Sequence, residues 1–257
     1  MTLATPNPSL TNHKNEIIFP RGEFWSDEPP LETDLHLRQI ILLIKSLEWL
    51  WRDRDDFFVT GNLTIYYSPN QKKSEFFRGP DFFLVLDTTR KPNRRSWVVW
   101  NEDGKYPNVI IEILSDSTAK TDREEKKQIY QDTFRTPDYF WFDPETLEFQ
   151  GFTLVSGIYQ PLEGNDRGWL WSQQLELYLG IQDDKLRYFT PDGELVLSPE
   201  EAAQQERERG KLEGKLEGKL EGKLESIPRL IQLGLTCEQI ATALDLDIET
   251  VKQMASS

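Results

Sequence analysis

The sequence predicts an α/β fold with a mixed central β-sheet flanked by helices, followed by a C-terminal helical extension. Three observations support this prediction. Residues 33–51 carry apolar side chains at helical spacing, several short β-rich runs follow, and the composition changes beyond Ser198. At 257 residues, with 37% hydrophobic and 12% aromatic content, the chain can bury one core of about 190 residues plus appendages.

The first predicted helix spans residues 33–51, and the segment Glu32-Thr33-Asp34 supplies its N-terminal cap. Its apolar residues recur every three to four positions: Leu35, Leu37, Ile40, Ile41, Leu43, Ile44, Leu47 and Leu50. This helix is expected to cover the sheet. Residues 1–19, which precede the core, are predicted to be disordered or loosely ordered.

The predicted strands begin with residues 57–60 and 63–67, joined through Gly61-Asn62, and continue at 82–87, 96–100 and 109–114. All are expected to form one sheet. Residues 82–86 and 109–114 are apolar nearly throughout instead of alternating, which is typical of strands covered on both faces. These two runs are therefore predicted to be central strands.

A second helix is predicted over residues 117–134, with Ser117 or Thr121 as its N-cap and with Ile129 and Tyr130 facing inward. A strand at 139–142 follows Pro137, and the turn at 143–146 leads into a hairpin of residues 147–154 and 158–162. The core is predicted to span residues 20–197 and to end with a Trp- and Leu-rich tail.

The C-terminal extension has two predicted parts. Residues 198–226 form a helical linker in which Gly-Lys-Leu-Glu repeats four times, and each glycine weakens the helix by about 1 kcal/mol relative to alanine. Residues 227–257 are predicted to form a small helix-turn-helix-like module, capped at Thr236 and Asp247. Its last helix carries two acidic residues, Asp247 and Glu249, and one basic residue, Lys252. A helix that reads DNA usually presents basic and amide groups, so a role in packing or oligomerisation is favoured over DNA recognition.

Composition limits the function classes. The single cysteine, Cys237, excludes an intramolecular disulfide and a cysteine-rich zinc site. Neither the polar N-terminus nor the short aliphatic run at 40–44 resembles a signal peptide or a membrane span, so a cytoplasmic location without membrane association is expected. A net charge of −14 argues against broad attraction to phosphate backbones.

Two carboxylates and a lysine form the candidate site. Asp81 follows Gly79-Pro80 at the start of one buried strand, Glu112 lies inside another, and Lys126 lies one helical turn before Tyr130. Such a set can hold Mg²⁺ and place a cation beside an attacking water. Burying a lone Glu112 would cost several kcal/mol unless a cation or a metal compensates it.

Each of these residues also has a structural interpretation. Asp81 could be a turn residue, Glu112 could form a structural salt bridge, and Lys126 could be a solvated charge, with Lys120 as a second choice for the lysine. Asp122 could cap the helix, ligate a metal through water or orient Lys126, and capping is favoured. The two histidines, His13 and His36, predict no zinc site, and His36 is expected to be a packing or surface residue.

The chain resembles the Uma-type branch (Uma-two family) of the PD-(D/E)XK, or restriction-endonuclease-like, superfamily over about residues 20–200. Four stretches carry the resemblance: Gly79-Pro80-Asp81, Glu112-Ile113-Leu114-Ser115, the segment 125–130 with Lys126, and the segment 137–144. The superfamily lysine would fall at Leu114, which cannot serve. The resemblance moves that lysine to the following helix, at Lys126.

The resemblance implies an endonuclease that hydrolyses phosphodiester bonds, with DNA as substrate and Mg²⁺ or Mn²⁺ as cofactor. Asp81, Glu112 and the carbonyl of Ile113 would bind the metal, and Lys126 would complete the catalytic set. Two alternatives stay open: an inactive nuclease-like binding or assembly module, and a DNA-binding regulator acting through the C-terminal helices. A homodimer through the core or the helical arm is a further expectation.

Overall fold

The structure is a computed structural model that describes residues 33–68, 77–91, 93–114 and 122–255. The chain divides into two compact units, Met1–Ser198 and Pro199–Ser257. The segment 1–19, His13, Lys120 and the two predicted caps Ser117 and Thr121 lie outside the described residues.

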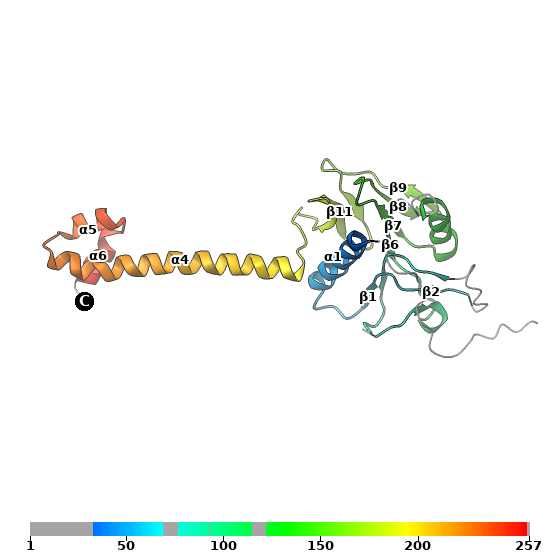
Figure 1. Cartoon of the computed structure of the whole chain (residues 1–257), viewed down its shortest axis with the longest axis horizontal. Coiled ribbons are helices and arrows are strands. Elements are labelled where there is room, and N and C mark those ends of the chain that lie inside the picture. Colours follow the sequence, from blue (N-terminus) through cyan, green and yellow to red (C-terminus); the bar gives the residue numbers. More distant parts are fainter. Residues whose placement is uncertain (1–32, 69–76, 92, 115–121, 256–257) are drawn as a thin grey trace, which may run out of the picture. The chain divides into compact units, whose positions relative to one another are not determined.

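A mixed six-stranded sheet is the centre of the first unit, in the order β1-β4-β6-β7-β8-β9 (Figure 1). The strands are β1 (Phe57–Thr60), β4 (Phe82–Leu86), β6 (Val109–Ile113), β7 (Asp138–Phe142), β8 (Phe149–Val155) and β9 (Ile158–Pro161). Within this sheet β6 and β7 run parallel, and the other pairings are antiparallel. The predicted α/β class with a mixed central sheet is confirmed.

Some predicted strands belong to a separate small sheet. β2 (Ile65–Tyr66) pairs with β3 (Phe77–Arg78) and with β5 (Trp97–Val98), whereas β1 pairs with β4. The expectation of one sheet including residues 63–67 and 96–100 was therefore wrong. A turn at Asn62, where φ is 47°, follows β1. The Asn62 N–H donates to the carbonyls of Pro80 and Asp81, and the chain leaves the direction of β1 at this point.

Both faces of the central sheet are covered, as the apolar runs of β4 and β6 predict. On one face lie α1 (Asp34–Leu50) and a sheet of β10 (Leu170–Ser172), β11 (Leu177–Gln182) and β12 (Lys185–Phe189). Gln39 joins α1 to β12, because its side chain donates to the Leu186 carbonyl and accepts from the Leu186 N–H. The sequence did not predict β10, β11 and β12 as strands.

The other face packs against β2, β5 and a helical segment at residues 122–134. In this segment α3 (Lys127–Ile129) is flanked by two π-helical turns, η2 (Asp122–Lys126) and η3 (Tyr130–Phe134). Tyr130 and Phe134 are buried, and Arg135 ends the segment with a left-handed φ of 57°. The predicted inward face of this helix is therefore present at Tyr130, whereas Ile129 is only partly buried.

The second unit begins with α4 (Pro199–Gln232), which contains the whole four-residue repeat. The predicted border between linker and terminal module, at residues 226 and 227, falls inside this helix. α5 (Cys237–Leu244) and α6 (Ile248–Ala255) pack on its end around Ile227, and Thr236 and Gln239 form a capping box. Among the described residues, no helix combines the length and apolar character that crossing a bilayer requires.

Candidate active site

The neighbouring strands β4 and β6 bring the two candidate acids together on the face that the 122–134 segment covers. Phe82 of β4 pairs with Ile111 of β6, so the same register places Asp81 opposite Glu112. Glu112 in turn pairs with Trp141 of β7. Paired Cα atoms in a sheet lie about 4.5–5.5 Å apart, and paired side chains share a face.

Glu112 has no exposed surface, and two side chains of the 122–134 segment approach its carboxylate. Lys126 Nζ lies 3.0 Å from Oε2, and the Tyr130 hydroxyl donates to Oε1 over 2.6 Å. The Lys126 side chain is 23% exposed, so it connects the buried acid with the solvent side. This is the compensating cation that the burial of Glu112 requires.

The sequence predicted only that Tyr130 faces inward. It did not predict the hydrogen bond from the Tyr130 hydroxyl to Glu112. The pKa of Tyr130 is raised well above the usual tyrosine value, first by burial and then by the Glu112 carboxylate, with a further contribution from Asp81. The phenol therefore stays protonated and remains a donor to Glu112. Asp81 lies opposite Glu112 in the sheet register, so its carboxylate adds to the negative charge near the phenol.

The backbone of Ile113 connects the other two polar groups of the site. Asp81 Oδ2 accepts a hydrogen bond from the Ile113 N–H over 2.8 Å. On the α1 side, His36 Nε2 lies 2.9 Å from the Ile113 carbonyl oxygen, and Thr33 Oγ1 lies 2.9 Å from Nδ1. Because a carbonyl only accepts, Nε2 carries a proton and donates.

His36 is buried, so the packing interpretation holds for its location, but its polar contact was not foreseen. It fixes the carbonyl that the resemblance assigns as a metal ligand. A carbonyl oxygen has two lone pairs, so this contact leaves one acceptor position.

Oxygen donors of this kind suit Mg²⁺, which usually keeps several waters and takes one or two carboxylates together with substrate phosphates. Asp81 directly precedes β4, Glu112 lies in the adjacent strand β6, and the Ile113 carbonyl belongs to the residue that follows Glu112. Within the described ranges, no three His, Cys, Asp or Glu side chains gather as a metal-binding group. The donors therefore fit a hydrated ion shared with a substrate, and they do not form an all-protein cage.

The two neighbouring lysines of the helix have different environments. Lys126 contacts Glu112, whereas the Lys127 ammonium lies 3.4 Å from the centre of the Phe152 ring. Burial lowers the pKa of Lys127. Consecutive helical residues point about 100° apart, which explains why only the first of them reaches the acid. The choice of Lys126 over Lys127 therefore agrees with the contacts.

Comparison with known families places this geometry in context. The model of the Uma2 family, described as "Putative restriction endonuclease", matches residues 6–187, which is more than half of the chain. The chain belongs to the Uma2 family. The resemblance read from the sequence motifs is thereby confirmed, and the matched region contains Asp81, Glu112 and Lys126.

A solved structure also resembles this Uma2 protein. It is described as a "putative nuclease belonging to DUF820" from Anabaena variabilis ATCC 29413. The two chains share 13% sequence identity with a TM-score of 0.46, and the match covers 61% of this chain and 83% of the other. No curated protein matches the Uma2 chain.

Proposed function

We propose that this Uma2 protein is a Mg²⁺- or Mn²⁺-dependent endonuclease that hydrolyses phosphodiester bonds in DNA. The observation that supports the proposal most is the ion pair between Lys126 and the fully buried Glu112, opposite Asp81. Membership in the family described as "Putative restriction endonuclease" points to the same chemistry.

In this proposal Asp81 and Glu112 hold the metal, with the Ile113 carbonyl as a third oxygen donor. When bound, the ion neutralises charge on the scissile phosphate and makes a water molecule more acidic. Tyr130 holds the Glu112 carboxylate in place through its 2.6 Å hydrogen bond. His36 fixes the direction of the Ile113 carbonyl through its 2.9 Å contact.

Lys126 has a separate role because, within the described part of the chain, it is the cation recorded in an ion pair with Glu112. Its ammonium lies 3.0 Å from Glu112, yet its side chain keeps some exposure, so it can also contact an oxygen of a phosphate. There it stabilises the negative charge that develops as water attacks, or accepts a proton from that water when neutral. This assigns to Lys126 the role that Leu114 cannot fill.

A plasmid-nicking assay across Mg²⁺ and Mn²⁺ concentrations tests the proposal. We expect wild-type protein to nick supercoiled DNA in the presence of metal, and the Asp81→Ala/Glu112→Ala variant to be inactive. A Glu163→Ala/Asp166→Ala variant, which removes the same charge from exposed positions, is the matched control. Equal nicking by the wild type and by the Asp81→Ala/Glu112→Ala variant would refute the proposed endonuclease activity.

The same assay separates the alternatives. An inactive binding module would leave plasmid intact with every variant. A regulator acting through α5 and α6 would bind chosen DNA sequences even with both acids replaced, and would lose that binding when the chain is cut after Glu225.

A further inference from the structure

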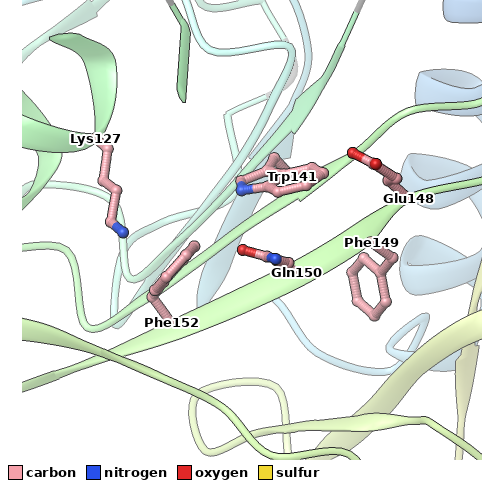
Figure 2. A pocket seen from close by; sticks show the side chains of 6 residues that line it. All are labelled: Lys127, Trp141, Glu148, Phe149, Gln150 and Phe152. Carbon is pink, nitrogen blue, oxygen red and sulfur yellow. The ribbon is translucent and has the colours of Figure 1, made fainter. Parts of the chain in front are cut away.

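A cavity of about 590 Å³ lies beside the candidate active site, and the proposed chemistry does not use it. Six residues line it: Lys127, Trp141, Glu148, Phe149, Gln150 and Phe152. Figure 2 shows Lys127 reaching from the helix toward the Trp141 and Phe152 rings, with Glu148 on the far side of Trp141. The volume falls in the range of about 300–1,000 Å³ that is usual for small-molecule sites.

Two walls of this cavity are direct neighbours of the candidate catalytic residues. Trp141 is the β7 partner of Glu112 in the parallel pairing, and Gln150 is the β8 partner of Trp141. Lys127 follows Lys126 in the chain. The row Asp81, Glu112, Trp141, Gln150 therefore crosses four strands on one face of the sheet, from the proposed metal site into the cavity.

The polar groups of the cavity are separated along its length. At one end the Lys127 ammonium lies on the Phe152 ring face, 3.4 Å from its centre, where a phosphate oxygen would be a better partner for the charge. Glu148 lies on the far side of Trp141 and Gln150 lies beside Trp141, toward the middle of the cavity (Figure 2); both are exposed, and Gln150 offers an amide donor and an acceptor. The Trp141 and Phe152 rings beside Lys127 are buried, and the Phe152 ring becomes accessible only when the Lys127 ammonium leaves it.

A nucleotide has the complementary order of groups: a phosphate, then a flat ring with a hydrogen-bonding edge. In a duplex the faces of each base are stacked on neighbouring bases and cannot contact protein rings. We propose that this cavity binds the unpaired base of single-stranded DNA next to the scissile phosphodiester, with Lys127 on the adjoining phosphate. The inference rests on the proposed function and names the form of DNA that the site takes.

Equilibrium binding to the full chain tests this inference without requiring hydrolysis. The probe is a fluorescein-labelled oligothymidine of 12 nucleotides, compared with a duplex of the same length by fluorescence anisotropy in Ca²⁺. We expect the single strand to bind at least 10-fold more tightly than the duplex. Lys127→Gln and Gln150→Ala should each weaken single-strand binding about 5-fold or more, whereas Lys185→Gln, at an exposed position of β12, should not.

A second measurement probes the base itself. Oligonucleotides with one abasic position each should show a single sensitive position, at which affinity falls about 5- to 150-fold, the factor equivalent to about 1–3 kcal/mol of stacking. Equal binding of duplex and single strand, or equal losses at every abasic position, would overturn the inference. Tighter binding of oligouridine than of oligothymidine would overturn the assignment to DNA.

The two proposals fail in different ways. If wild-type protein nicks plasmid but Lys127→Gln and the abasic series leave binding and kcat/KM unchanged, the proposed function stands and the cavity has another role. If the single strand binds with these sensitivities but no metal supports cleavage, the cavity is a nucleotide site and the proposed reaction is wrong.

Discussion

Replacing Lys126 by methionine removes the cation beside a fully buried carboxylate while keeping a similar side-chain length. Removing one partner of a buried ion pair costs about 3–5 kcal/mol of folding stability. Here the cost is smaller, because the Lys126 side chain is 23% exposed and Tyr130 still donates to Glu112. We therefore expect Lys126→Met to lower the free energy of unfolding by about 2 kcal/mol.

Urea unfolding followed by tryptophan fluorescence measures this loss. All 8 tryptophans lie before Pro199, so the signal reports only the unit that contains the site. With a urea dependence of about 2 kcal/mol per molar, the expected loss moves the midpoint down by about 1 M. Lys185→Met is the control, because exposed substitutions usually change stability by less than about 0.5 kcal/mol.

A double-mutant cycle isolates the interaction. Adding Glu112→Gln to Lys126→Met removes the uncompensated charge, so the double variant should be more stable than Lys126→Met alone by about 1 kcal/mol or more. If Lys126→Met changes stability no more than the control does, Lys126 is a solvated charge, and the reasoning about the buried acid is refuted.

Three further predictions concern the supports of the site. Tyr130→Phe removes the donor to Glu112 and should cost about 1–3 kcal/mol in the same urea assay; no loss would mean that water replaces the phenol. Gly61→Ala should destabilise by about 1–3 kcal/mol, since a Cβ there would lie 2.4 Å from Ile40 and 2.5 Å from the Asp81 carbonyl oxygen, whereas Gly214→Ala, in open space on α4, should not. Burial raises the pKa of Asp138 in the folded state, so its stabilising contribution is present at low pH and is lost as pH rises through that pKa. The stability advantage of wild type over Asp138→Asn should therefore fall between pH 4 and pH 7, and an advantage that grows with pH would show the opposite shift.

The sequence predicted those parts of the site that depend on local pattern. Glu112 lies in an unbroken apolar run, which indicates burial and the need for a cation, and the four-residue spacing of Lys126 and Tyr130 selects the lysine that faces the sheet. Helix α1 and the hairpin of β8 and β9 also follow from periodicity and turn residues.

What the sequence did not predict depends on contacts between distant residues. His36 meets the Ile113 carbonyl across 77 positions, and no local pattern marks such a pair. The cavity depends on the register that sets Trp141 between Glu112 and Gln150. Strands at residues 63–67 and 96–100 were predicted, but their place in a separate sheet depends on pairing between distant residues, β2 with β3 and with β5, which local pattern does not show.

A crystal structure of the protein soaked with Mn²⁺ tests the central claim most directly, because anomalous scattering locates the ion without assumptions about its ligands. The account predicts one strong peak within about 2.0–2.5 Å of carboxylate oxygens of both Asp81 and Glu112, with the Lys126 ammonium nearby. A soaked crystal with no ion between these two carboxylates, or with the ion bound elsewhere, would contradict it.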